Sequence, residues 1–476
     1  MWQKSKNNIV LINYIFNDLI KMVYFNRYKI SWIALVFSVV ISVFIRAPFA
    51  FQDEQVHYIR ALGISNNQVF SYSQSGKDSE LGHDIDSANL LFVDTFLMKP
   101  PLISIKWLND TRMAHTGVKE YRINTSAAPY TPVPYFSYAL AAKIARTVGV
   151  SVRTEFILMR LAGAITTLLI LFIAFKVVQE KYRWFILALS LLPMCIASFA
   201  AISIDGFTIA SAVLFMSVIY SLVDKIKIDK LHKKDLLLLA FSSFLLITAK
   251  MPLFLFIGLI PCMVIIFRNK IPNKYKILFL SLTAISGLLV VCWALFVKDI
   301  NTGVYWGKNV NTAAQLRYVL LNPLRYLFNL LFSISSYNFF DLTFYTYSNN
   351  KFSNNIPFIF DLIIITGLSL STFVVNRQPK ASPQDKKLYW VCVSVFFISV
   401  ISIFTLLYLQ FTPIGTPNEI QGVQPRYFIP FLPLILMIPF KLKLSPVFKI
   451  FVYCTPFLGI GIYWVLIFMQ LINFRP

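Results

Sequence analysis

The chain has 476 residues, of which 57% are hydrophobic, 16% aromatic and only 14% charged. A soluble globular domain carries about 25% charged residues, so this composition excludes a soluble protein and indicates one built into a membrane. The net charge of +23 could suggest a nucleic-acid-binding protein. The basic residues lie in short connections between apolar runs, however, so the charge reflects membrane topology and no nucleic-acid partner is expected.

Apolar runs predict an all-α integral membrane protein. A helix needs about 20 apolar residues to cross ~30 Å of hydrocarbon, and on that basis we expect about 11 spans, within a range of roughly 10 to 13. They lie near residues 30–47, 157–176, 184–203, 206–223, 236–249, 251–267, 277–297, 357–375, 388–408, 427–440 and 450–470. The five cysteines all lie within apolar stretches, which argues against disulfides.

The distribution of basic residues predicts the orientation. Lys and Arg next to a span stay on the cytoplasmic side, and a cytoplasmic N terminus puts clusters such as residues 225–234 and 268–276 on that side. Residues 1–29 then form a cytoplasmic segment that can hold an interfacial helix, and residues 30–476 form a single polytopic domain. The long segments 49–156 and 298–356 fall on the extracytoplasmic side.

These two outer segments are rich in Tyr, Trp, Asn and Pro, so we expect ordered loops that carry amphipathic helices. Residues 132–148 predict one such helix at the membrane surface. The alternative, that they cross the membrane, would invert the later topology unless residues 319–337 also crossed.

The most informative residues follow the first apolar run, where Asp53 and Glu54 are adjacent. On a helix starting there, Asp53, His57 and Arg60 share one face, because their spacing is i, i+4 and i+7. Glu54 points about 100° away. A carboxylate, an imidazole and a guanidinium are thus brought together at the membrane edge. A simple helix cap at Asp53 is the alternative.

Here the sequence resembles the GT-C superfamily of polytopic glycosyltransferases, and more narrowly the bacterial domain-of-unknown-function 2142 family. The resemblance rests on the run Asp53-Glu54-x-x-His57-x-x-Arg60 and on four later motifs. These are Tyr130-x-Pro132-x-Pro134-Tyr135, Ser203-Ile204-Asp205, Lys250-Met251-Pro252 and Pro425-Arg426-Tyr427-Phe428-Ile429-Pro430. It implies a GT-C-like fold and, for Asp53, the role of general base in an inverting transfer, with Glu54 as the other candidate and His57 beside them.

Such an enzyme must also hold the phosphate of a lipid-linked donor. The cations at the outward ends of the predicted spans are candidates because arginine and lysine both bind phosphate, although each could simply reach lipid headgroups. They are Lys250, Arg426 and Arg160, and Arg60 on the helix after the first span is a further candidate. Asp205 could orient a cation or the acceptor. Tyr130, Tyr135 and Trp306 could stack on sugars, or anchor the protein at the interface.

No cofactor follows from the sequence. Asp78, Glu80, His83, Asp84 and Asp86 form an acidic patch that could hold a divalent ion, but their irregular spacing is more typical of a solvated loop.

The expected function is sugar transfer from a polyprenyl-phosphate donor to a glycan or lipid-linked acceptor of the cell surface. The protein would lie in a bacterial inner membrane, with its active site extracytoplasmic and with membrane partners in glycan synthesis. Two alternatives stay open: a transporter or flippase for lipid-linked glycans, and a non-catalytic partner in glycan assembly. Ionisable residues deep within the spans would favour a transporter.

Overall fold

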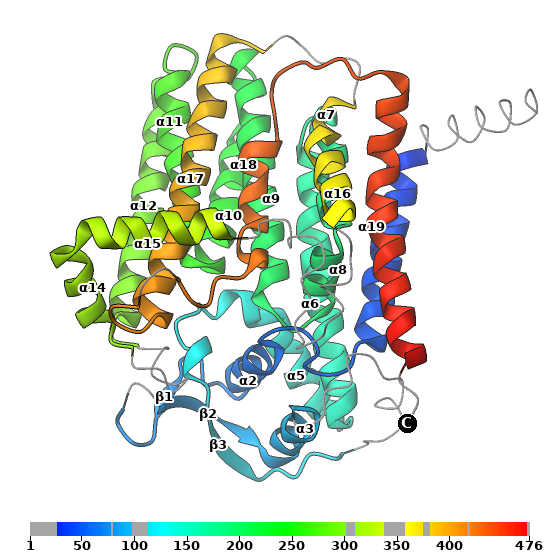
Figure 1. Cartoon of the computed structure of the whole chain (residues 1–476), viewed down its shortest axis with the longest axis vertical. Coiled ribbons are helices and arrows are strands. Elements are labelled where there is room, and N and C mark those ends of the chain that lie inside the picture. Colours follow the sequence, from blue (N-terminus) through cyan, green and yellow to red (C-terminus); the bar gives the residue numbers. More distant parts are fainter. Residues whose placement is uncertain are drawn as a thin grey trace, which may run out of the picture.

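The computed structural model describes residues 26–77, 80–97, 113–300, 310–337, 358–374, 381–416 and 419–473. Long helices run side by side in a bundle, and a smaller cap of short helices and strands covers one end of it (Figure 1). Residues 1–25 of the N-terminal segment that is expected to hold an interfacial helix lie outside the described residues. The cap follows the first helix of the bundle, as expected for the segment 49–156.

Six helices are long and apolar enough to cross a membrane. They are Asn26–Ile45, α6 (Val152–Val177), α9 (Ile204–Lys227), α12 (Asn273–Val297), α17 (Pro383–Phe411) and α19 (Pro446–Asn473). A seventh span is counted if α7 (Glu180–Ser190) and α8 (Pro193–Ala200) are taken together, although the chain bends by 73° between them. The protein is therefore a mostly helical, multi-pass membrane protein.

The other predicted spans are helices shorter than 18 residues or are broken into pieces. They correspond to α10 (Lys233–Ala249), η4 (Met251–Gly258) with α11 (Leu259–Ile266), α16 (Phe358–Leu370) with η7 (Ser371–Phe373), and η8 (Pro425–Tyr427), η9 (Ile429–Phe431) and α18 (Leu432–Leu436). Proline is the first residue of η8 and the second residue of η4, η9 and α18, and it lacks the backbone donor that continuing the preceding helix would need. The count of about 11 thus exceeds the six or seven that the described residues support.

The cap contains a small sheet, which corrects the all-α prediction. The described part of the cap comprises α2 (Glu54–Ser65), β1 (Tyr72–Ser73), β2 (Leu81–Asp86), α3 (Ser87–Leu97), β3 (Lys119–Ile123), η2 (Thr125–Ala127), η3 (Val133–Tyr135) and α5 (Phe136–Val148). The strands pair antiparallel in the order β1-β2-β3, with Gly82 opposite Ile123 and Asp86 opposite Lys119. The polar side chains of β2 made this segment look like a solvated loop.

The lengths of three helices bear on the alternatives for the outer segments. The α5 helix has 13 residues, about 20 Å at ~1.5 Å per residue, which is too short to cross a bilayer. Residues 319–337 fall on two helices, α14 (Thr312–Leu321) and α15 (Pro323–Ser336), which are separated at Asn322. Neither segment forms a span.

The α9 helix lies at the centre of the bundle, and its apolar window is buried on all sides. It packs along α6 and α10, whereas only 11% of the corresponding window of α12 is buried. Because α9 contacts protein all round, its N-terminal residues are held in a fixed position beneath the cap. This is where Asp205 lies.

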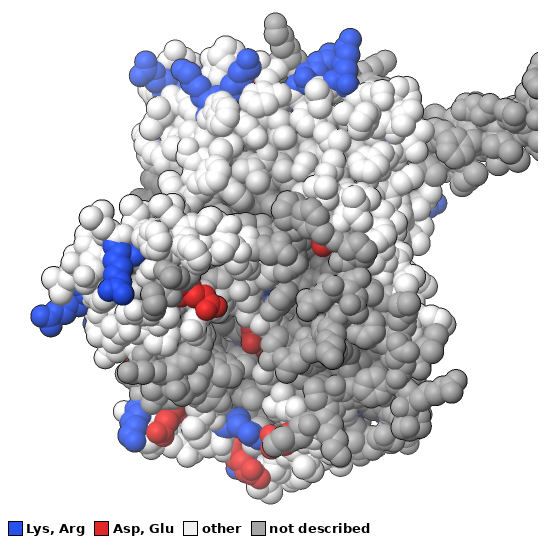
Figure 2. Space-filling model, in the orientation of Figure 1, with Lys and Arg blue, Asp and Glu red and all other residues white. Residues whose placement is uncertain are grey.

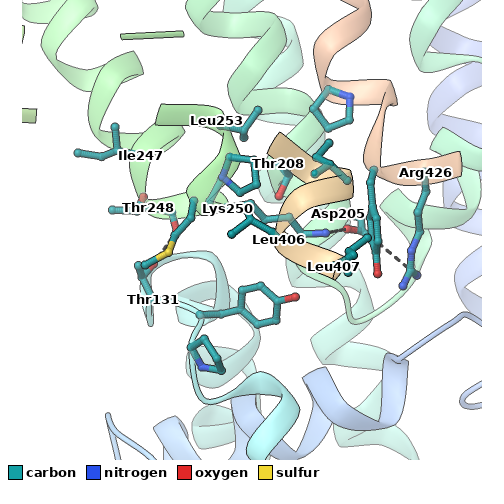
Figure 3. Close-up of a pocket in the computed structure, with 18 of the residues that line it drawn as sticks. Thr131, Asp205, Thr208, Ile247, Thr248, Lys250, Leu253, Leu406, Leu407 and Arg426 are labelled. Carbon is teal, nitrogen blue, oxygen red and sulfur yellow. Dashed lines mark hydrogen bonds and ion pairs between the residues drawn. The ribbon is translucent and has the colours of Figure 1, made fainter. Parts of the chain in front are cut away.

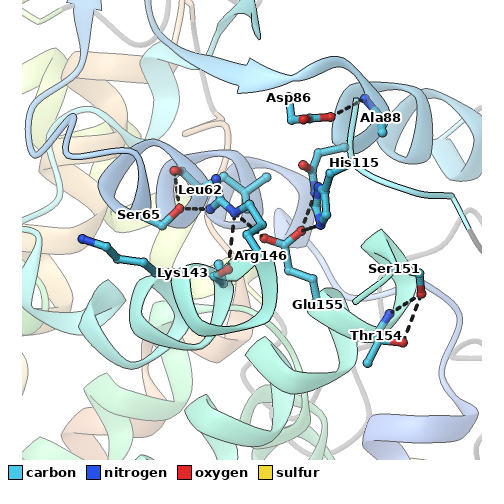
Figure 4. A network of polar contacts seen from close by, with 12 residues as sticks. Leu62, Ser65, Asp86, Ala88, His115, Lys143, Arg146, Ser151, Thr154 and Glu155 are labelled. Atoms are coloured by element: carbon cyan, nitrogen blue, oxygen red, sulfur yellow. Dashed lines mark hydrogen bonds and ion pairs between the residues drawn. The ribbon is translucent and has the colours of Figure 1, made fainter. Parts of the chain in front are cut away.

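A buried polar network ties the cap to α6 (Figure 4). The carboxylate of Glu155, which is fully buried, is 3.0 Å from Nε of Arg146 on α5, and it accepts a hydrogen bond of 2.8 Å from the amide of Asn89 on α3. A nitrogen of His115 lies 3.5 Å away. The network thus joins α3, α5 and the segment that carries His115 to α6, and α5 in turn packs against α2.

Candidate functional site

The candidate site forms where four segments that are distant in sequence meet. Asp53 immediately precedes α2, and Asp205 is the second residue of α9, whose first turn is capped by the hydroxyl of Ser203. Lys250 stands between α10 and η4, and Arg426 lies in η8. Each of the four residues lies at the end of a helix or in a break between helices. Their side chains meet where the bundle adjoins the cap.

The backbone at Asp53 is left-handed, with φ of 61° and ψ of 10°. Among residues with a side chain, Asp and Asn adopt this conformation most readily. The conformation directs the chain into α2, which begins at the next residue. It leaves the carboxylate 35% exposed, beside groups that are almost completely buried.

These four residues form a continuous chain of ion pairs. Arg426 donates to Oδ2 of Asp53 through Nη2 and to the backbone carbonyl of Gln52 through Nη1. The same Nη1 lies 3.3 Å from Oδ2 of Asp205, whose Oδ1 is 2.5 Å from Nζ of Lys250. Arg426 and Asp205 are only 2% and 5% exposed. Two cations and two carboxylates therefore balance one another.

Three of the four charged residues line a cavity of about 210 Å³ (Figure 3). One side is polar, with Asp205, Lys250 and Arg426. The other side is apolar, and its walls come from α10, η4, α17 and η9; its residues include Ile247, Leu253, Ile403, Leu406, Leu407 and Phe431. The cavity thus offers charged groups to one end of a ligand and an apolar surface to the other.

Aromatic rings complete the polar side. Tyr130 and Tyr427 line the cavity, and Nζ of Lys250 lies 4.8 Å from the ring centre of Tyr427. Tyr427 was not singled out from the sequence, although it adjoins Arg426 in the motif that carries the resemblance. Trp293 of α12 also lines the cavity and donates a hydrogen bond of 2.9 Å to the carbonyl of Pro129.

His57 does not line the cavity but lies next to Tyr130, which does. Its Nδ1 is 2.8 Å from the hydroxyl of Tyr135, and its ring centre is 5.8 Å from that of Tyr130. Burial lowers the pKa of His57 from 6.5 to about 4, against the opposing effect of Asp205 and Asp53. The imidazole is therefore neutral at pH 7, and Tyr135 is one step removed from the cavity, in contact with His57 rather than lining it.

This depressed pKa predicts that the contribution of His57 to the stability of the fold decreases in mild acid. The unfolded chain binds a proton at His57 below about pH 6.5, whereas the folded chain resists it down to about pH 4. The stabilisation is therefore complete above pH 6.5 and falls as the pH drops towards 4, by up to about 3 kcal/mol. Measuring the free energy of unfolding in detergent between pH 7 and 4 tests this prediction. In the His57→Gln variant this free energy should depend less on pH than in the wild-type protein. An equal pH dependence in the two proteins would contradict the assignment to His57.

Glu54 and Arg160 form a separate, fully buried pair. Arg160 donates to both carboxylate oxygens of Glu54, at 2.8 and 2.7 Å. Its remaining donors bond the carbonyls of Val43, Arg46 and Ala47. Glu54 also accepts from two backbone N–H groups, those of Phe49 and Ile202. All five guanidinium N–H groups are used, so the pair fastens the first helix, α2 and α6 together.

This arrangement corrects two expectations. The carboxylate of Glu54 accepts four hydrogen bonds, two of them from Arg160, and has no free lone pair facing the cavity, so Glu54 is not placed to act as a base. Arg160, at 1% exposure, has no donor left for a lipid phosphate. Neither residue lines the cavity.

Arg60 also lies away from the cavity. Its guanidinium is 3.1 Å from Nε2 of His83 and donates to the hydroxyl of Ser71 and, at 3.4 Å, to the carbonyl of Tyr130. The expectation that it shares a face with Asp53 and contacts a donor phosphate is therefore not met. Asp53 has a left-handed backbone and lies outside the helix, so the helical spacing does not extend back to it.

The described residues of the predicted acidic patch contact other residues of the cap. His83 contacts Arg60, Asp84 accepts from the amide of Gln68, and Asp86 accepts from the backbone N–H groups of Ala88 and Gly117. Within the part of the chain that the structure describes, no group of three or more His, Cys, Asp or Glu residues could hold a metal ion. Asp78 and Trp306 lie outside the described residues.

Comparison with known proteins places the chain in a family. A search of curated proteins gives no significant match. The family model described as "Predicted membrane protein (DUF2142)" matches residues 35–435, a range that contains the four charged residues of the site and the pair Glu54–Arg160. The chain therefore belongs to the DUF2142 family of predicted membrane proteins.

Proposed function

We propose that this protein is a membrane glycosyltransferase of GT-C type that moves a sugar from a polyprenyl-phosphate donor to a cell-surface glycan or lipid-linked acceptor. The observation that carries the proposal is the bridge made by Arg426. This residue joins the partly exposed carboxylate of Asp53 to a cavity that is charged on one side and apolar on the other. Such a cavity suits a ligand with a charged head and a hydrocarbon chain.

The two cations are suited to holding the donor phosphate. Lys250 and Arg426 both line the cavity, and their only acidic partners among the described residues are Asp53 and Asp205. A phosphate entering the cavity would compete with these carboxylates for the same N–H groups. The phosphate would also be the leaving group, and the cations would stabilise the charge that develops on it.

Asp53 is suited to be the general base. The acceptor hydroxyl must lose a proton as it attacks the anomeric carbon, and Asp53 is the exposed carboxylate of the four-residue chain. When Arg426 turns towards the donor phosphate, the carboxylate of Asp53 becomes free to take that proton. A single displacement of this kind inverts the configuration of the sugar.

The location of the charges favours an enzyme over a transporter. Asp205 lies in the first turn of α9 rather than at its middle, and Lys250 lies in a break between helices. Figure 2 shows Lys and Arg gathered at the end of the molecule opposite the cap. By the rule that basic residues stay inside, this end faces the cytoplasm of a bacterial inner membrane and the site faces outwards.

Binding of undecaprenyl phosphate, the carrier common to donors with different sugars, tests the proposal. We expect it to bind the purified protein in detergent, and Lys250→Met to raise its Kd by at least about 10-fold, since a charge-assisted hydrogen bond contributes roughly 1.5–3 kcal/mol. Lys143→Met is the matched control, because Lys143 is an exposed cation of the cap that does not line the cavity. Equal Kd values for the two variants, or no binding at all, would contradict the proposal.

A further inference from the structure

The α14 and α15 helices expose an apolar surface that the proposed function does not use. Five large side chains of α15 are between 44% and 79% exposed: Leu324, Leu327, Phe328, Leu331 and Phe332. Their spacing places them on one face of the helix. Leu316, Leu320 and Leu321 of α14 continue the surface, at 47% to 71% exposure.

The opposite face of α15 packs on the end of α17. Tyr326 bonds Thr405 through their hydroxyls at 2.6 Å, and Asn329 donates to the carbonyl of Thr416. On α14, the buried Gln315 donates to the carbonyls of Tyr408 and Thr412. The apolar surface therefore points away from the protein, and it is held there by polar contacts on the inner face.

These contacts also fix the position of α14 and α15 along the length of the bundle. At ~1.5 Å per residue, Thr405 lies about 9 Å from the end of α17 at Phe411. Trp293 lies about 6 Å from the corresponding end of α12 at Val297, next to the rings of Phe70 and Phe296. Tryptophan gathers at the membrane–water interface. In Figure 1, α15 lies across α17 rather than along it.

The charged residues of α14 and α15 also fit a position at the membrane surface. Residues 310–337 contain Arg317 and Arg325 but no Asp or Glu, and both arginines lie on exposed positions. Ile398 and Ile401 of α17, which are exposed and do not line the cavity, lie within two turns of Thr405 on a helix that is itself long and apolar enough to cross the membrane. The apolar surface of α14 and α15 thus continues the lipid-facing surface of the bundle.

We infer that α14 and α15 form an in-plane membrane anchor at the cap end of the bundle. The leucine and phenylalanine side chains lie among the acyl chains just below the headgroups, and Arg317 and Arg325 contact lipid phosphates. An amphipathic helix with these properties lies about 5–10 Å into the headgroup and acyl boundary. This inference does not depend on the proposed enzymatic activity.

Spin labels in nanodiscs of phosphatidylcholine and phosphatidylglycerol test the inference. Single cysteines replace Leu324, Phe328 or Leu331 in a full-length protein whose five native cysteines are alanine. Collisions with oxygen, which dissolves in lipid, and with a water-soluble nickel chelate give the depth of each label. We expect high oxygen and low nickel accessibility, and a depth between those of two reference labels, Leu289→Cys on α12 and Val118→Cys beside β3.

Nickel accessibility equal to that of Val118→Cys would overturn the inference, because the surface would then face water. Low accessibility to both reagents would overturn it as well, because protein and not lipid would cover the surface, and dipolar distances between labels would identify a second copy. Each of the three positions is tested separately, so a variant that does not fold leaves the other two decisive.

Discussion

Replacing Asp53 by asparagine should abolish most sugar transfer while the protein stays folded. Asparagine tolerates the left-handed backbone at this position as well as aspartate does, and it keeps an oxygen for Arg426. It cannot accept the proton of the acceptor hydroxyl, and loss of a general base lowers the rate by about 10²- to 10⁴-fold. Transfer from a polyprenyl-phosphate donor measures the loss, with the sugar identified by glycan analysis of a deletion strain.

Asp94→Asn is the matched control. This carboxylate also lies in the cap and pairs with an arginine, Arg122, but it is 49% exposed and does not line the cavity. It should keep full activity. The Asp53→Asn protein should still bind undecaprenyl phosphate, because Lys250 and Arg426 remain. Full transfer by Asp53→Asn would refute the assignment of the base and point to a non-catalytic partner in glycan assembly.

The second large effect concerns stability. Glu54→Gln leaves the charge of Arg160 buried without its partner, and breaking a buried pair in this way costs about 3–5 kcal/mol. Unfolding of the purified protein in detergent, followed by temperature or by added denaturing detergent, measures the change. Glu80→Gln is the control, since Glu80 pairs with Lys77 at the surface, where an ion pair contributes about 0–1 kcal/mol.

A double-mutant cycle separates the pair from its surroundings. Arg160→Met combined with Glu54→Gln should cost less than the sum of the two single changes, because neither charge is then left alone. Transfer per folded molecule should be unchanged in Glu54→Gln. Loss of transfer without loss of stability would instead return Glu54 to the position of candidate base.

Part of the site could be predicted from the sequence because its signals are local. Asp53, Lys250 and Arg426 each stand beside a proline, a helix start or an apolar run, which places them at the ends of helices. Their meeting is not a local property. Arg426 reaches Asp53 across 373 residues of sequence, and only packing around α9 brings them together. The same holds for Arg60, whose partner His83 lies on a strand that was not predicted.

The number of spans also depends partly on local sequence and partly on tertiary packing. Mean hydropathy over a window measures the apolar residues that a segment contains, so it identifies every stretch that can be buried. It does not tell whether the stretch is buried in lipid or in protein, or whether it is broken. The chain from Met251 to Ile266 has the composition of a span, yet it begins as a 3-10 helix and packs against α12 and α17.

By itself, the sequence determined that this is a multi-pass membrane protein, and it identified the few charged residues at helix ends from which a site could be built. These follow from composition and from spacing along the chain. Only the tertiary structure distinguishes the surroundings of the two adjacent acids: Glu54 is buried against Arg160, while Asp53 stays partly exposed beside Arg426. Adjacent residues on a turn point in different directions, and which direction is buried depends on partners more than a hundred residues away.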